Sequence, residues 1–346
     1  MLIKTDDYPF HQIPAPLLSW YRENKRDLPW RLNADPYRVW VSEIMLQQTR
    51  VEAAKEYYLR FLNELPTFFD LAACEEERLM KLWEGLGYYS RARNLQKTAK
   101  IVVDSYGGIF PKTVKELRSL PGIGEYTAGA IASIAYYERE PAVDGNVFRV
   151  LSRLTENPTD ISEPKYRGYL TEVLREIYPE NGGACSEFTQ SLMELGALIC
   201  KPQSPDCDIC PMKGICRVFE HGTQDKFPVL PEKKETRREQ VCVLMLLTPN
   251  GLAVRKRESG VLKGMNEFPS FVGLNVEESL KQIGISEYKI IRTRKFSHIF
   301  THIVWEMTAY LVKTDFAPFD CYSLAEIEEK VSLPTAFKQC LGIFKE

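Results

Sequence analysis

Four cysteines lie within 17 residues and place the strongest constraint on how this chain folds. They are Cys200, Cys207, Cys210 and Cys216, with the spacing C-x6-C-x2-C-x5-C. Four thiolates at such short spacing can close a tetrahedral shell around one metal centre, either a structural zinc ion or a [4Fe–4S] cluster. Zinc knuckles usually pair two C-x2-C units, and this segment has one. The spacing therefore favours an iron–sulfur loop over residues 200–216.

The remaining cysteines are scattered, and the total of nine is odd. The N-terminus, MLIKTDDYPF, lacks the apolar region of a secretory signal. Both features argue against a disulfide framework. The longest apolar run, Val241–Leu247, is far too short to span a bilayer. We therefore expect a cytoplasmic protein without a targeting signal and without a membrane partner.

The periodicity of apolar residues changes once along the 346 residues. Residues 1–220 show helical patterns broken by Pro and Gly, including one long stretch over residues 35–65. Asp35-Pro36 and Thr113 are typical helix starts. Residues 221–234 have prolines, charges and no periodicity, which indicates a linker. Residues 235–346 are strand-like and predict a small α+β domain, with VCVLMLL and LAVRKR flanking a hairpin turn at TPNG.

A glycine turn, LPGIG over residues 120–124, precedes a run of small and apolar residues. This pattern predicts a helix-hairpin-helix near residues 117–135. Gly122 and Gly124 permit a tight turn and a close approach of the backbone to a ligand. Free N–H groups at the start of the second helix can bind a phosphate oxygen. An αα-hairpin turn without a ligand is the alternative, and the overall net charge of −2 favours neither.

The order of these motifs resembles the helix-hairpin-helix base-excision DNA glycosylases that carry an iron–sulfur cluster. The hairpin, the aspartate in VDGNVFRVLSRL and the four cysteines follow one another as in that superfamily. The resemblance implies a mainly α, two-lobed glycosylase domain with a [4Fe–4S] loop. In the endonuclease III branch, a lysine two residues past the second glycine attacks the sugar. This chain has Tyr126 there.

A phenol cannot form the Schiff base that a lysine amine forms, so the chain resembles the monofunctional adenine DNA glycosylase (MutY) branch. The implied partner is double-stranded DNA containing an 8-oxoguanine:A or G:A pair, so that the protein would associate with the nucleoid. We expect a monomer, and no segment indicates a protein partner. The alternatives are a glycosylase/lyase of the endonuclease III type and a non-catalytic scaffold that binds damaged DNA.

Two carboxylates are candidates for the chemistry of base removal, which needs an acid for the base and an anion for the sugar. On a helix, Glu43 has mostly apolar neighbours, so burial would raise its pKa; a surface glutamate or a buried ion pair is the alternative. Asp144 precedes a helix and is also a plausible N-cap. The resemblance implies that Glu43 is the general acid and that Asp144 stabilises the sugar cation.

Further contacts come from the resemblance alone, against the alternative of core aromatic residues and helix-surface amides. LPWR, QQT and FTQ match segments that hold the flipped adenine and its strand, and GLGYYSRARN matches a loop that inserts into the duplex with Tyr88 as its intercalating residue. The implied contact residues are Trp30, Arg31, Gln48, Thr49, Leu86, Gly87, Tyr88 and Gln190.

The C-terminal segment resembles the MutT-like (Nudix) domain of MutY proteins. A Nudix hydrolase needs an R-E-x-x-E-E box to bind magnesium, and VEESLKQIGI lacks one. We therefore interpret residues 235–346 as a lesion-recognition domain. The family's sensing turn aligns with Phe300-Thr301-His302, and the Thr301 hydroxyl in it could bond 8-oxoguanine. Phe296-Ser297-His298 is the rival register, and core phenylalanines with surface histidines are the alternative.

Overall fold

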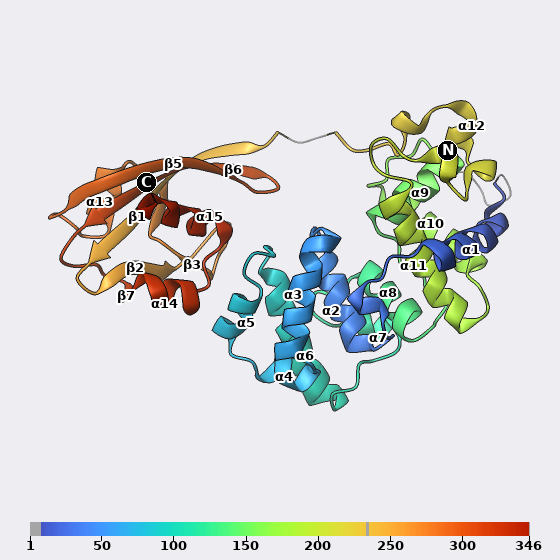
Figure 1. The fold of residues 1–346 in the computed structure, drawn as a ribbon, viewed down its shortest axis with the longest axis horizontal. Coiled ribbons are helices and arrows are strands. Elements are labelled where there is room, and N and C mark those ends of the chain that lie inside the picture. Colours follow the sequence, from blue (N-terminus) through green and yellow to red (C-terminus); the bar gives the residue numbers. More distant parts are fainter. Residues whose placement is uncertain (1–7, 233–234, 346) are drawn as a thin grey trace. The chain divides into compact units, whose positions relative to one another are not determined.

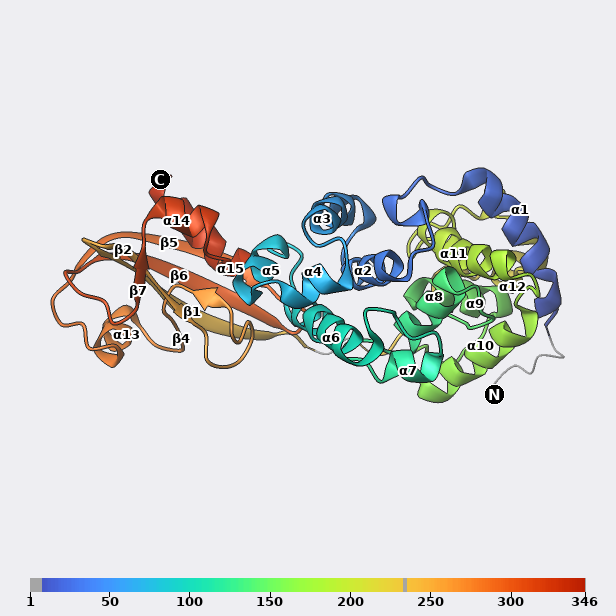
Figure 2. The ribbon, with the colours of Figure 1, turned by 90° about the horizontal axis from the view of Figure 1, so that it is seen from below.

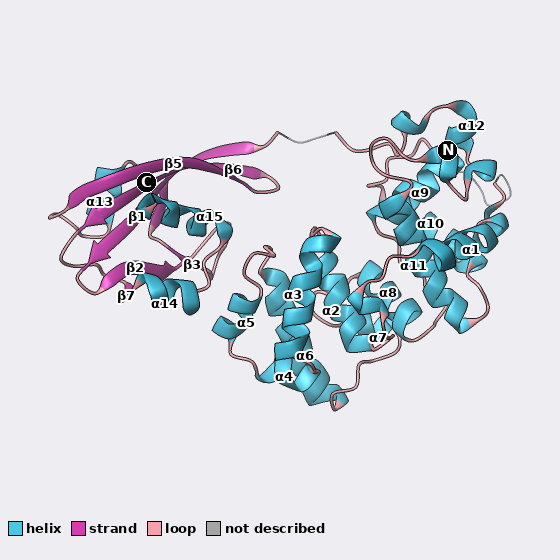
Figure 3. Ribbon diagram, in the orientation of Figure 1, coloured by secondary structure: helices cyan, strands magenta, loops and turns pink. Residues whose placement is uncertain are grey.

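The computed structural model describes residues 8–232 and 235–345, which form two compact units. The helical unit contains the described residues up to Ala73 together with Asn94–Glu232. The sheet unit contains Cys74–Arg93 together with the described residues from 235 onward. All described strands lie in the sheet unit (Figure 3). The first residues, including most of MLIKTDDYPF, and residues 233 and 234 of the expected linker lie outside the described residues.

The helical unit is built from short to medium helices connected by tight turns (Figure 1). Both predicted helix starts are confirmed. The Asp35 side chain accepts from the Arg38 N–H with Pro36 in the first turn, and the Thr113 side chain accepts from the Glu116 N–H. The helices are α1 (Pro14–Asn24), α2 (Pro36–Leu46), α3 (Val51–Glu64), α4 (Phe68–Ala73), α6 (Ser90–Tyr106, of which the first turn belongs to the sheet unit), α7 (Val114–Arg118), α8 (Glu125–Ala135), α9 (Gly145–Thr155), α10 (Pro164–Ile177), α11 (Gly182–Leu198) and α12 (Arg217–His221).

The long helical pattern over residues 35–65 is interrupted, which the sequence analysis did not predict. Helix α2 ends at Leu46 and α3 begins at Val51. Between them Gln48 has a φ of 57°, a left-handed conformation that ends a helix. The break places Gln48 and Thr49 in a turn beside the end of α2 rather than on its face.

One core of the helical unit is formed where α1, α9, α10 and α11 meet. Fully buried side chains include Leu17 of α1, Leu151 of α9, Leu170 of α10 and Phe188 of α11. Partly buried Cys200, Cys210 and Cys216 pack against the same core, so the predicted metal loop is attached to the end of α11 by apolar contacts.

The sheet unit contains a mixed sheet with the strand order β3-β2-β1-β6-β5. Strand β1 runs antiparallel to β2, so the predicted hairpin at TPNG is confirmed, and parallel to β6 over eleven register pairs. Strand β5, which the sequence analysis missed, pairs antiparallel with β6. The strands are β1 (Arg237–Thr248), β2 (Gly251–Lys256), β3 (Asn266–Glu267), β4 (Ser270–Val272), β5 (Lys289–Ile299), β6 (Ile303–Lys313) and β7 (Asp320–Tyr322).

Each face of this sheet is covered by helices, which gives the unit two small cores. Helix α13 (Val276–Gln282) lies on one side, and α14 (Leu324–Glu329) lies on the other, as Figure 2 shows. Trp305 and Phe337, the latter in α15 (Thr335–Lys338), are buried on the α14 side, and Phe271 and Leu280 on the α13 side. Helix α5 (Glu76–Leu82) belongs to this unit as well: the Ser332 hydroxyl donates to the Met80 carbonyl at 3.1 Å.

No helix in the described parts of the chain is long and apolar enough to cross a membrane.

Candidate active site and iron–sulfur loop

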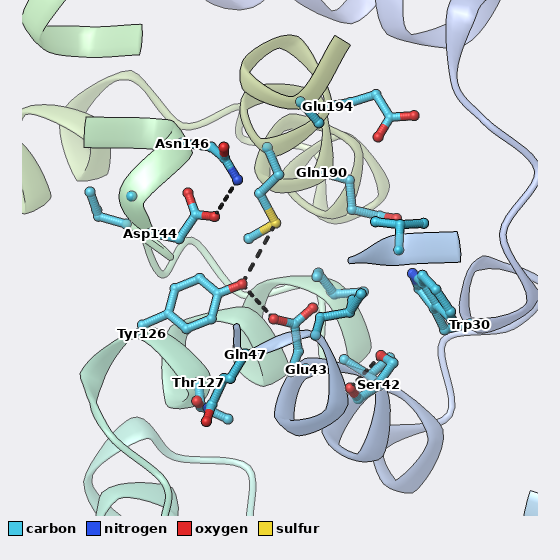
Figure 4. Close-up of a pocket in the computed structure, with 18 of the residues that line it drawn as sticks. Trp30, Ser42, Glu43, Gln47, Tyr126, Thr127, Asp144, Asn146, Gln190 and Glu194 are labelled. Atoms are coloured by element: carbon cyan, nitrogen blue, oxygen red, sulfur yellow. Dashed lines mark hydrogen bonds between the residues drawn. The ribbon is translucent and has the colours of Figure 1, made fainter. Parts of the chain in front are cut away.

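Glu43 lies near the end of α2 with its carboxyl group removed from solvent. The residue is 6 % exposed, and the Tyr126 hydroxyl of α8 donates to Glu43 Oε2 at 2.5 Å (Figure 4). Burial raises the pKa of Glu43 to about 7, although the Tyr126 hydroxyl lowers it, and the Asp144 carboxylate adds to the upward shift. The expected burial is therefore confirmed, and at this pKa the group can hold a proton near neutral pH. Burial also raises the pKa of Tyr126 well above its usual range, so its hydroxyl stays protonated.

Asp144 caps α9, so the N-cap interpretation is confirmed. Its Oδ1 accepts from the Val147 N–H at 2.8 Å and its Oδ2 from the Asn146 amide at 2.8 Å. Burial raises the pKa of Asp144, while these bonds and the Arg149 charge oppose that shift. The carboxylate thus lines the same pocket as Glu43 and is held in a fixed orientation by two bonds from its own helix.

Two residues that the sequence analysis missed connect Asp144 to the loop that begins at Cys200. The Asn146 amide oxygen accepts from Arg149 Nη2 at 2.8 Å. Arg149 in turn donates to the backbone carbonyls of Gly196 and Cys200, both at 2.8 Å. Asn146 follows Asp144 by two positions, so its bond to the capping carboxylate could in principle be predicted from VDGN. The partners of Arg149 lie 47 and 51 residues away and could not be predicted from the local sequence.

An open groove of about 890 Å³ contains Glu43, Tyr126 and Asp144. The structure brings most of the predicted base-binding residues to it, from four separate segments of the helical unit. Gln190 of α11 points into this space in Figure 4, and its amide donates to Ser186 of the same helix. Trp30 is 8 % exposed, and its ring meets Tyr58 edge-on at 5.4 Å. The predicted residues at the groove are Trp30, Arg31, Gln48, Thr49, Gly122, Gly124 and Gln190.

The predicted hairpin joins α7 to α8, and its two glycines are used differently. Gly122 has a φ of 77°, and a Cβ at this position would lie 2.8 Å from Asn94 Cβ. Gly124 is the N-cap of α8 with ordinary extended backbone, and a Cβ there would meet open space. The turn therefore requires glycine at 122, whereas Gly124 leaves the start of α8 open to an approaching group.

Cys200, Cys207, Cys210 and Cys216 line one small cavity together with apolar side chains such as Leu195, Met212 and Val218. Four thiols around one cavity supply the donor set that a [4Fe–4S] cluster binds, so the residues present fit that group.

The segment with the predicted intercalating residue belongs to the sheet unit. Leu86, Gly87 and Tyr88 form a turn before α6, in which Gly87 and Tyr88 have φ values of 68° and 45°. The turn is held by the Trp83 indole, which donates to the Gly87 carbonyl at 3.0 Å, and by Arg91, which donates to the Leu86 carbonyl at 2.9 Å. Leu86 is buried, whereas Tyr88 is 46 % exposed.

Phe300, Thr301 and His302 form the turn between β5 and β6. Phe300 packs edge-on against Trp305 at 4.8 Å, and Thr301 and His302 are exposed. The Thr301 hydroxyl is hydrogen-bonded to the Tyr88 hydroxyl of the same unit. The rival residue Ser297 lies within β5, opposite Glu306 of β6. The first register thus places the Thr301 hydroxyl at an exposed turn, and the rival register places the Ser297 hydroxyl along a strand.

Comparisons with known families agree with this arrangement. Residues 41–176 match the HhH-GPD superfamily of base excision DNA repair proteins, and residues 200–216 match the iron–sulfur binding domain of endonuclease III. Residues 242–342 match the NUDIX domain. A solved structure of a non-covalent endonuclease III–DNA complex aligns with 65 % of this chain and 100 % of that chain, with a TM-score of 0.53 and 26 % identity. The expected fold classes of both parts are confirmed.

Among curated proteins, the chain is 35 % identical to the adenine DNA glycosylase of Mus musculus over 87 % of this chain and 70 % of that protein. It is 41 % identical to that of Rattus norvegicus over 70 % of this chain, and the match spans about half, 51 %, of the rat protein. The chain therefore belongs to the adenine DNA glycosylase family, whose members are hydrolases of base excision DNA repair. The [4Fe–4S] cofactor expected from the cysteines is confirmed as well.

Proposed function

We propose that this protein removes adenine from DNA where it is mispaired with 8-oxoguanine or guanine, by hydrolysis and without cutting the strand. The observation that carries this proposal is the pair formed by Glu43 and Tyr126 in a groove that also presents the Asp144 carboxylate. A buried acid with a pKa of about 7 and an anion on the same groove are what cleavage of a base–sugar bond needs.

In the proposed mechanism, a flipped adenine enters the groove and Glu43 transfers its proton to a ring nitrogen of the base. The bond between the anomeric carbon and the base nitrogen then breaks, and both electrons leave with the base. The sugar becomes positively charged, and the Asp144 carboxylate stabilises it. Water adds to the anomeric carbon and gives up one proton to the Glu43 carboxylate. The Tyr126 hydroxyl keeps Glu43 in place throughout.

Strand cleavage is not part of this reaction, because the groove supplies no suitable amine. Tyr126 stays protonated and points at Glu43. No lysine is among the described residues that line the groove. A lyase would need such an amine to form a Schiff base with the sugar. This favours the monofunctional mechanism over the glycosylase/lyase alternative.

The sheet unit supports a second part of the proposal, recognition of the base opposite adenine. Tyr88 and Thr301 are exposed side chains from two turns, and their hydroxyls are bonded to each other. An aromatic side chain at such a turn can insert into a base stack, and a hydroxyl can both donate to and accept from the polar edge of 8-oxoguanine. We therefore assign lesion sensing to Thr301 rather than to Ser297.

The cysteine loop has a structural part in this proposal. Cys200, Cys207, Cys210 and Cys216 would hold the cluster, and their bonds to its iron would tie residues 200–216 to the end of α11. Cys200 follows α11 closely, and α11 carries Gln190 on the groove. The four cysteines thereby help to fix one wall of the groove.

A single-turnover reaction tests the proposal, using a duplex with one 8-oxoguanine:A pair that is labelled on the adenine strand. Half of each time point is heated with alkali and half is left untreated. Cleavage after alkali alone is the expected result. Cleavage without alkali would show a lyase and overturn the monofunctional assignment. Tight binding without cleavage under either condition would favour the scaffold alternative and remove Glu43 and Asp144 from the chemistry.

A further inference from the structure

Among the residues that helix α11 presents to the groove are those at positions 190, 193 and 194, a spacing that places them on one helical face. Gln190 was expected there. The sulfur of Met193 lies 3.9 Å from the Tyr126 hydroxyl. The carboxylate of Glu194 is directed away from Glu43 in Figure 4. Glu194 has no part in the mechanism proposed above.

Glu194 is nevertheless one of the most completely bonded carboxylates of the helical unit. Its side chain is 1 % exposed. Its two oxygens accept from the Arg26 backbone N–H at 2.9 Å, from Arg26 Nε and Nη2 at 2.9 and 2.7 Å, and from Arg31 Nη1 and Nη2 at 3.1 and 2.9 Å. These bonds lower the pKa of Glu194 to about 2 in spite of its burial, so it remains charged.

These contacts fix the orientation of Arg31. Both of its terminal nitrogens donate to Glu194, and Nη1 also donates to the Arg26 carbonyl at 3.0 Å. The guanidinium lies over the Tyr21 ring, 5.5 Å from its centroid. The Nε–H has no part in these bonds, and Arg31 lines the groove.

The charge of Arg31 bears directly on the acid. A cation near Glu43 favours the ionised carboxylate and also opposes a proton on the base, which is the opposite of what the reaction needs. The Glu194 carboxylate, which Arg31 shares with Arg26, cancels part of the Arg31 charge at short range. We propose that Glu194 is a positioning residue that holds Arg31 against the adenine pocket and neutralises part of its charge, so that Glu43 can act as an acid. This proposal rests on the proposed function.

Other charged groups near the two sites do not replace Glu194. Besides burial, the hydrogen bond from Tyr126 and the charges of Asp144 and Arg31 act on Glu43. Glu187, on the same helix, is paired at 2.7 Å with the exposed Arg22. Glu52 acts on Arg26 but forms an ion pair with Lys55 at 3.0 Å. Arg167 lines the groove and lies over the Phe148 ring.

The test compares single-turnover excision against pH for Glu194→Gln, Arg31→Met and the double variant. In Glu194→Gln the uncompensated Arg31 lowers the pKa of Glu43, so that the loss of rate on the alkaline side begins about 0.5 to 1 pH unit earlier than in the wild type. Arg31→Met moves the pH at which the rate begins to fall in the opposite direction. The double variant removes both charges and returns this pH to the wild-type value, even though its maximum rate is lower.

Glu187→Gln is the matched control. Like Glu194, Glu187 is a carboxylate of α11 that is paired with an arginine, but its partner Arg22 is exposed. This variant should leave the profile unchanged. Glu194→Asp keeps the charge and should restore the profile. If Glu194→Gln does not fold, as judged from its melting temperature and cluster absorbance, the pH profile of Arg31→Met tests the proposal alone. A shift toward alkaline pH supports the proposal, and an unchanged profile overturns it.

Identical pH profiles for Glu194→Gln, Arg31→Met and the wild type would overturn the inference and leave Glu194 a structural ion pair. That result would not affect the proposed function, which is tested separately by adenine release and alkali-dependent cleavage with the wild-type chain.

Discussion

The groove of the helical unit and the turn between β5 and β6 in the sheet unit carry similar polar side chains, but these side chains differ in their exposure to solvent. Around Glu43, hydroxyl, carboxylate and guanidinium groups are buried or half-buried and hydrogen-bonded to other protein groups. Around Thr301, the hydroxyl and imidazole groups are exposed at the end of a hairpin. Burial changes the pKa of a group and so creates an acid, whereas recognition of a base edge needs groups that can exchange a protein partner for a DNA partner.

The largest expected effect breaks the buried side of this comparison. Glu43→Gln removes the transferable proton and Asp144→Asn removes the anion, so that each should lower single-turnover excision by about 10²–10⁴-fold while duplex binding is retained. Rates come from quenched time courses and affinities from a gel-shift assay. Glu52→Gln, at an exposed position of α3, is the control. Near-normal rates in either variant would show that burial at this groove serves stability alone.

The pH dependence sharpens the same contrast. Because burial raises the pKa of Glu43 to about 7, the acid is protonated below that pH and loses its proton above it. The excision rate should therefore fall by about tenfold for each pH unit on the alkaline side, whereas duplex affinity should not follow this curve. The linked consequence for stability has the same sign. The folded state binds more protons than the unfolded state between the ordinary pKa of a glutamate and about 7, so stability decreases as pH rises through that window.

A smaller effect is expected on the exposed side. Thr301→Ala removes one neutral hydrogen bond and should reduce the preference for 8-oxoguanine:A over G:A by about three- to tenfold. The measurement is the ratio of excision rates on the two duplexes, with Ser297→Ala as the matched control. If Ser297→Ala reduces the ratio and Thr301→Ala does not, the sensing hydroxyl lies in β5 and the two regions are less different than proposed.

The smallest effects concern the two hairpin glycines. Gly122→Ala should cost about 1 kcal/mol or more, because its φ is positive and Asn94 occupies the space of a Cβ, which lowers Tm by about 2–4 °C. Gly124→Ala should leave Tm unchanged and weaken duplex binding by about two- to fivefold, because the added methyl stands before the start of α8. Equal Tm values with equal affinities for both variants would argue for a hairpin without a phosphate.

Local patterns predicted what depends on local physics. The caps at Asp35 and Thr113, the strand pair around TPNG and the buried face of Glu43 all follow from neighbours within four residues. The bond between Tyr126 and Glu43 joins residues 83 apart, and no periodicity encodes it.

Other features were missed for the same reason. The left-handed Gln48 that separates α2 from α3 sits in a continuous helical pattern, and β5 carries too many charged residues to be distinguished from a loop. Glu194 lies one helical turn beyond Gln190, but its arginine partners are more than 160 residues earlier in the chain. The catalytic and binding roles taken from the family remain predictions until the variants are measured.

The parallel pairing of β1 with β6 sets an order on how the protein is made. Thr248 ends β1 long before Lys313 ends β6, so the central pair of the sheet cannot form on the ribosome until more than 60 further residues have been synthesised. Cys74–Arg93, made much earlier, packs in the same unit and must wait longer still. The groove residues, all between Arg26 and Ala197, can meet before then. Synthesis therefore delivers the residues of the groove first and the sheet unit last, with non-local pairing as the slow step.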